Sequence, residues 1–129
     1  MIMRRVKFKV VSINHTGVRN SLYAEGSYNL LYPKGAIVRA RENTLGVAVF
    51  QTRQDALDFC SHRDFISSNM IIRVCPIGRG KNVNYVSRST QYHNLDIFYA
   101  HVKGDTLEFG DTMRPPFGTI FYPAVEVLD

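Results

Sequence analysis

The chain has 129 residues, of which 45% are hydrophobic and 12% aromatic, and its formal net charge is +5. This length suits a single globular domain over 1–129, and the apolar content can offset the entropy of ordering a core, which excludes a largely disordered chain. No apolar run approaches the roughly 20 residues of a membrane-spanning helix, and Lys7 and Lys9 interrupt the apolar stretch of a signal peptide, so we expect a soluble, cytoplasmic protein without a membrane contact.

The N-terminal part predicts short strands joined by turns. Arg5–Val10 alternates charged and apolar residues with period two, which is typical of a strand with Val6, Phe8 and Val10 toward the core and the cations toward water. The further elements, in chain order, are a turn at 14–17, an irregular stretch at 18–26, strands at 28–32 and 36–40, and a Pro-Lys-Gly turn at 33–35 between these two strands.

A strand–helix–strand unit is expected in the middle of the chain. Gly46–Gln51 is apolar and β-branched enough for a buried strand, and Met70–Ile77 predicts another. Between them, Thr52 stands at the N-cap of a helix at about 53–62, with Asp55 three residues later in a variant of the capping box. The apolar face of this helix is expected to comprise Ala56, Leu57, Phe59 and Cys60.

The C-terminal part has weaker patterns. Residues 83–92 predict a strand or an extended loop, and 94–101 predict a short second helix or another strand. Arg114–Gly118 predicts a rigid turn, and 119–128 a closing strand that Pro123 would place at an edge or at a bulge. Many short strands around one clear helix indicate an α+β fold with a mainly antiparallel sheet.

The expected turn Gly78–Lys81 is the one element suited to binding an anion. Gly78 and Gly80 let the backbone approach a ligand closely, and Arg79 and Lys81 add positive charge beside successive N–H groups. The segment is not a Walker A loop, because the spacing GxxxxGK followed by Ser or Thr is absent. Alternatively, the glycines serve only the geometry of a solvent-exposed turn.

Tyr85 and Arg88 follow this turn and extend the candidate site. Exposed aromatic rings stack on bases while cations hold phosphates, and single strands and nucleotides are bound in this way. Tyrosines on half-buried strands are equally typical of a core or of its rim. The sequence leaves both interpretations open.

Positive charge is concentrated toward the N-terminus. Residues 1–41 hold eight Lys or Arg and one Glu, whereas residues 94–129 hold two basic and six acidic residues. A basic surface of this kind attracts polyanions, or the two oppositely charged ends pair with each other. The partners we expect are therefore nucleic acid, a nucleotide or an acidic protein surface.

Catalytic and metal-binding signatures are incomplete. His93 and His101 would have to act with the cations of the glycine turn in an RNA- or nucleotide-processing enzyme, and no spacing brings them together. Cys60 and Cys75 have no Cys or His at zinc-ligand spacing, and a pair of buried free thiols is expected rather than a disulfide. We expect neither a metal nor a cofactor.

The run Val49–Phe59 resembles the strand-to-helix step of many small, uncharacterised phage and prokaryotic proteins. A comparable step occurs in ADP-ribosyltransferase-like folds, whose catalysis needs a basic residue, a hydroxyl strand and a glutamate. Ser89-Thr90 and Glu126 are the counterparts in this chain, and a Glu-x-Glu pattern is absent. The resemblance implies a similar scaffold without the chemistry. A phage or virus is one source that we consider for the protein, and in that case we expect it to act in the host cytoplasm.

The sequence therefore favours a small, non-enzymatic binding or regulatory protein that engages an anionic partner. Two alternatives stay open beside it. The first is an enzyme that processes RNA or nucleotides. The second is an oligomeric structural or inhibitory protein whose edge strands, such as 119–128, pair between chains.

Overall fold

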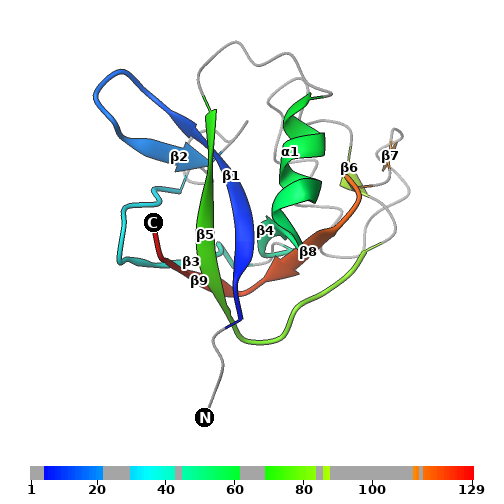
Figure 1. The fold of residues 1–129 in the computed structure, drawn as a ribbon. Helices are drawn as coiled ribbons and strands as arrows, with labels where there is room; N and C mark the ends of the chain where they lie inside the picture. Colours follow the sequence, from blue (N-terminus) through cyan, green and yellow to red (C-terminus); the bar gives the residue numbers. More distant parts are fainter. Residues whose placement is uncertain are drawn as a thin grey trace.

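The computed structural model describes residues 5–21, 30–42, 45–61, 69–83, 86–87, 112–113 and 115–129. Within these ranges it has one helix and a mainly antiparallel seven-stranded sheet, which confirms the α+β fold (Figure 1). The elements are β1 (Lys7–Ile13), β2 (Arg19–Ser21), β3 (Ile37–Arg39), β4 (Val47–Phe50), α1 (Arg53–Ser61), β5 (Asn69–Ile77), β6 (Val86–Ser87), β7 (Thr112–Met113), β8 (Thr119–Tyr122) and β9 (Ala124–Val127). Strands β6 and β7 form a separate two-stranded pair.

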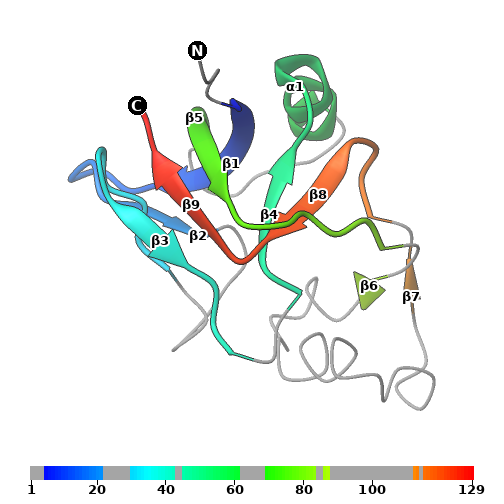
Figure 2. The ribbon, with the colours of Figure 1, turned by 90° about the horizontal axis from the view of Figure 1, so that it is seen from below.

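The main sheet closes on itself through one bent strand. The order of six strands is β3-β9-β5-β1-β4-β8, and the seventh, β2, pairs with β1 beside this path. Only Pro123 separates β8 from β9. Because β4 pairs with β8 and also meets β1, where Phe50 lies opposite Phe8, the path β1–β4–β8/β9–β5 returns to β1. Figure 2 shows β8 and β9 as one ribbon with a sharp bend.

This closure corrects the expectation that 119–128 is an edge strand. Strand β9 lies between β3 and β5, and β8 lies between β4 and Lys81. Pro123 is tolerated because it stands at the bend between the two halves of the strand, where no ladder hydrogen bond from its nitrogen is required. The sequence also allowed Pro123 to stand at a bulge. Pro123 lies opposite an irregular interval, because Ile77 pairs with Ala124 whereas Lys81, four residues later, pairs with Phe121.

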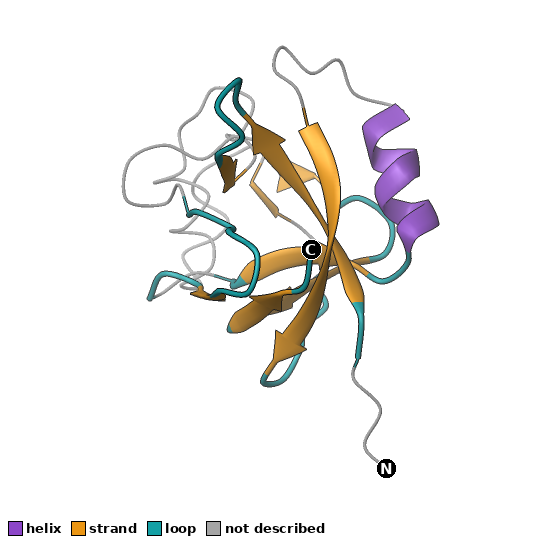
Figure 3. Cartoon of the chain, turned by 60° about the vertical axis from the view of Figure 1, so that its left-hand side comes forward, coloured by secondary structure: helices purple, strands orange, loops and turns teal. Residues whose placement is uncertain are grey.

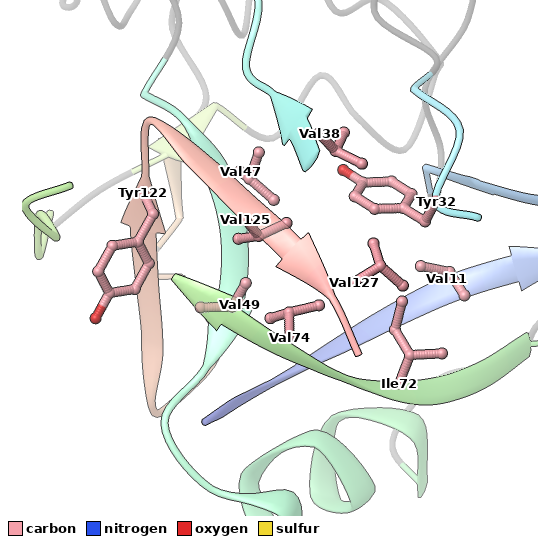
Figure 4. Packing of buried hydrophobic residues seen from close by; sticks show 10 residues of the cluster. All are labelled: Val11, Tyr32, Val38, Val47, Val49, Ile72, Val74, Tyr122, Val125 and Val127. Carbon is pink, nitrogen blue, oxygen red and sulfur yellow. The ribbon is translucent and has the colours of Figure 1, made fainter. Parts of the chain in front are cut away.

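The interior of the closed sheet is filled mainly by β-branched side chains. Valine suits a narrow interior because it is compact and packs well on a pleated surface. Tyr32, from the segment before β3, is the largest fully buried side chain of the described residues. The buried cluster comprises Val11, Tyr32, Val38, Val47, Val49, Ile72, Val74, Tyr122, Val125 and Val127 (Figure 4).

Helix α1 packs against the outer face of the sheet, beside β1 and β5 (Figure 3). It begins as expected, because the Oγ1 atom of Thr52 accepts a hydrogen bond of 3.1 Å from the N–H group of Asp55. Ala56 is fully buried, and the rings of Phe50 and Phe59 lie 5.3 Å apart between centroids. Leu57 is 43% exposed, so its place in the expected apolar face was wrong.

Strand β1 is buried on both faces, contrary to the expectation that its cations face water. Phe8 and Val10 lie under α1, and Lys9 and Val11 face the interior of the sheet. Lys9 is only 9% exposed, whereas Val6, expected in the core, is 37% exposed. The alternation predicted that one face of β1 contacts solvent. Instead, one face of β1 lines the interior of the closed sheet and the other is covered by α1.

Two further expectations differ from the structure. Arg19–Ser21 forms β2 where irregular chain was expected. Leu31, expected within a strand over 28–32, makes a single bridge to Asn20, and residues 28–29 lie outside the described ranges. The expected second helix at 94–101 also lies outside them.

Candidate anion-binding surface

The segment Gly78–Lys81 continues along the bent strand and does not reverse the chain, which corrects the predicted turn. Ile77 lies opposite Ala124 at the end of β5. Four residues later, Lys81 pairs with Phe121 through two backbone hydrogen bonds of 2.8 and 3.0 Å. The partner strand covers the same interval in three residues, so the segment contains one extra residue and forms a β-bulge.

The two glycines of this bulge have packing reasons. Gly78 has φ +87°, a conformation that side chains rarely adopt, and a Cβ there would lie 3.0 Å from Cγ of Pro123. A Cβ on Gly80 would lie 2.8 Å from both Ile120 and the ring of Tyr122. These close approaches support the alternative stated above, in which the glycines serve geometry.

Three exposed cations surround the bulge. Arg79 and Lys81 belong to it, and Arg5 reaches it from the start of β1. The guanidinium of Arg5 donates to the carbonyl oxygens of Gly78 at 3.2 Å and Pro76 at 3.4 Å. Its Cζ atom lies 5.8 Å from the centroid of the Tyr122 ring, within the range of a cation–π contact. We call Arg5 and Gly78–Lys81 together the basic bulge.

The cations of the basic bulge differ in their partners from Arg73, the one basic residue within β5. Two guanidinium nitrogens of Arg73 donate to Oδ1 of Asp129 at 2.7 and 3.0 Å. The backbone N–H of Arg73 donates to Oδ2 of the same carboxylate at 2.8 Å. These hydrogen bonds lower the pKa of the Asp129 carboxyl below its usual value. Within the described part of the chain, Arg5, Arg79 and Lys81 have no such carboxylate partner.

Sequence reasoning did not identify Arg5 as a member of the site. The contact joins residues 71 and 73 positions apart, and only the antiparallel pairing of β1 with β5 brings them together. Tyr85 and Arg88, the other two predicted site residues, lie outside the described ranges. The structure thus brings Arg79 and Lys81 together with an arginine from the far end of the sequence.

Lys9 is the second residue that sequence reasoning placed wrongly. Its Nζ atom donates a hydrogen bond of 2.8 Å to the carbonyl oxygen of Ala48 and lies 5.4 Å from the ring centroid of Tyr32. Burial lowers the pKa of Lys9 from 10.5 to about 8. Because the ammonium group is enclosed by the sheet, it is not part of the surface that a macromolecule would touch.

The described residues contain little that suits nucleophilic or metal chemistry. Cys60 and Cys75 are free and half-buried, and burial raises the pKa of the Cys60 thiol, which disfavours the thiolate. Among these residues, no three His, Cys, Asp or Glu side chains gather as a metal site requires. Glu126 lies on β9, and Ser89, Thr90 and the two candidate histidines lie outside the described ranges.

No protein family, curated protein or solved structure was found to match the chain. Across the described residues, the one helix is too short and too polar to cross a membrane. The properties of the basic bulge itself therefore carry the functional argument.

Proposed function

We propose that this is a non-enzymatic binding protein whose basic bulge engages a polyanion, with single-stranded nucleic acid as the ligand to be tested first. The observation that carries the proposal is the set of three exposed cations, Arg5, Arg79 and Lys81, beside one bulge with no carboxylate partner among the described residues. Phosphates along a strand are spaced closely enough to meet several such cations.

The geometry of Arg5 adds to this argument. Two carbonyl oxygens and the Tyr122 ring hold its guanidinium, so less side-chain entropy is lost when a phosphate binds. Figure 4 shows the Tyr122 ring apart from the other labelled core side chains, with its hydroxyl pointing away from them. Arg5 covers a face of this ring, so base stacking is not its role, and the proposed contact is to the backbone of the nucleic acid.

Salt titration of two charge-matched double variants tests the proposal. A short labelled oligothymidine would be titrated with the wild type and with each variant at several salt concentrations, and binding would be followed by fluorescence anisotropy. R79Q/K81Q removes two charges from the basic bulge, and the control K34Q/R39Q removes two charges around β3. Losing two phosphate contacts should reduce the slope of log affinity against log salt by about 1.4. The control should keep the wild-type slope. Equal losses in both variants, or affinity that does not change with salt, would reject the proposal.

A further inference from the structure

A second surface lies at β3, on the other side of β9 from β5. The N–H of Val127 donates to the carbonyl of Ala36 at 2.8 Å, and the N–H of Ala40 donates to the carbonyl of Pro123 at 2.9 Å. In an antiparallel pair, the residues that bond the partner strand alternate with residues whose polar groups point outward. The N–H and C=O groups of Ile37 and Arg39 therefore point away from β9.

This outer edge of β3 is unpaired within the described part of the chain. Its register with β9 is the one strand pairing that β3 makes there. Ile37 is 56% exposed and Arg39 is exposed, while Val38 between them is buried in the interior. The edge that was expected at 119–128 thus lies at β3 instead, and it presents donors and acceptors for one more strand.

The chemistry around this edge is basic and apolar. Residues 30–41 contain Lys34, Arg39 and Arg41 and no acidic residue, while Glu126 of β9 lies opposite Ile37 and Asp129 lies within electrostatic reach of Lys34. Ile37 is the exposed aliphatic side chain of β3 itself. A strand added here would meet the Arg39 cation and the exposed Ile37 side chain together.

We propose that the outer edge of β3 binds an extended acidic peptide segment of a partner protein as an additional antiparallel strand. The main chain of the peptide would exchange hydrogen bonds with Ile37 and Arg39. Its carboxylates would face Arg39, and aliphatic side chains on the same face of the peptide would pack on Ile37. This surface is separate from the basic bulge and does not depend on it.

The charges favour an acidic peptide over a second copy of the chain. Antiparallel self-pairing centred on Val38 would place Arg39 of each copy opposite Ile37 of the other and would gather Lys34 and Arg39 from both copies at one edge. The two Arg39 residues would then be diagonal neighbours on one face, within reach of each other because the side chains are long, and their like charges would repel. A nucleic acid would use the cations but would leave the outward N–H and C=O groups and the aliphatic side chains without strand partners.

The test uses a fluorescein-labelled acidic hexapeptide in which every second residue is threonine, and the residues between the threonines, which would share the face of Ile37 and Arg39, include both glutamate and valine. Two isomeric versions would carry N-methyl groups on one or the other set of alternate residues. Because only one set of amides faces β3 in an added strand, methylation of one set should abolish binding and methylation of the other should leave it within about twofold. Equal effects of the two methylated peptides would overturn the proposal, since charge attraction alone does not distinguish them.

Variants of the edge give an independent result. Arg39→Glu should weaken binding of the acidic peptide about tenfold and create binding of the matching peptide with lysine in place of glutamate. Ile37→Pro removes an outward N–H that β9 does not need, and Ile37→Ala is its control with the N–H retained. If the proline variant fails to fold, Arg39→Glu and the methylated peptides still decide the question.

The remaining outcomes separate this surface from its alternatives. R79Q/K81Q should bind the peptide as the wild type does, even if it no longer binds oligothymidine. Unchanged peptide affinity in Arg39→Glu, displacement of the peptide by oligothymidine, or a dimer by light scattering that Arg39→Glu dissolves would each overturn the proposal.

Discussion

Lys9 lies inside the ring of strands, although lysine is rarely buried without a charged partner. The Ala48 carbonyl and the Tyr32 ring both favour its ammonium form, but desolvation outweighs them and lowers the pKa to about 8. Keeping this charge below that pH costs folding free energy. The cost is on the order of 3 kcal/mol, the equivalent of the shift in pKa.

We predict that stability rises as the pH increases from about 8 to about 10.5. Across this window the unfolded chain keeps the proton on Lys9 while the folded chain loses it, so the unfolded state binds more protons and the free energy of unfolding increases with pH. Below about pH 8, Lys9 is charged in both the folded and the unfolded chain, and the folded state bears the full free-energy cost of burying the ammonium group. Lys9→Met should therefore be the more stable protein near neutral pH, by up to about 3 kcal/mol.

Urea denaturation of wild type and Lys9→Met at a series of pH values checks this prediction. The difference in unfolding free energy should shrink as the pH rises through the window, because wild-type Lys9 becomes neutral in both states. Lys34→Met, an exposed lysine, controls for the loss of a titrating group on the surface. A difference that stays constant with pH would show that the buried amine is not the cause.

At the scale of the element, α1 depends on a local cap. The Oγ1 atom of Thr52 satisfies one of the N–H groups at the start of the helix, and the short helix buries only Ala56 fully. We predict that Thr52→Ala destabilises the protein by about 1 kcal/mol. Thr52→Ser keeps the hydroxyl and should retain most of the stability. Thermal denaturation followed by circular dichroism measures both, and equal loss in the two variants would contradict a role for the cap.

Helices and strands that depend on neighbouring residues were predictable from the sequence. The strand pairings that close the sheet on itself join distant segments and were not predictable. The cap and period of α1 lie within ten residues, and β5 ends at Ile77 as expected. The inward orientation of the Lys9 side chain arises because the opposite face of β1 is covered by α1, which the sequence around Lys9 does not indicate. Likewise, Gly78–Lys81 has the composition of a turn, and only its partner, Phe121, shows that it is a bulge.

The same distinction applies to the candidate site. Arg79 and Lys81 were predictable because glycine and cation lie together in the sequence. Arg5 was not, because strand pairing brings it to the bulge. The edge strand was misplaced for a similar reason. Pro123 is typical of an edge, but here it stands at the bend where β8 passes into β9.

At the scale of the whole molecule, closure of the ring makes each strand depend on the next. Strand β5 loses one of its two partners if either β1 or β9 detaches, and the interior cluster draws residues from all three strands. We therefore predict that the buried amides of Ile72, Val74 and Val125 exchange hydrogen only through global unfolding. Their exchange free energies should equal the unfolding free energy from denaturant titration.

Strand β3 should behave differently, since it adds to the ring and does not close it. The outward amides of Ile37 and Arg39 have no strand partner in the described residues, so they should exchange nearly as fast as in an unfolded chain. Native-state hydrogen exchange by NMR reports both groups in one experiment, and adding the acidic peptide should protect these two amides alone. Protection of Ile37 and Arg39 in the free protein would mean that the edge is already covered, and opening of β5 below the global free energy would mean that the ring does not unfold as one unit.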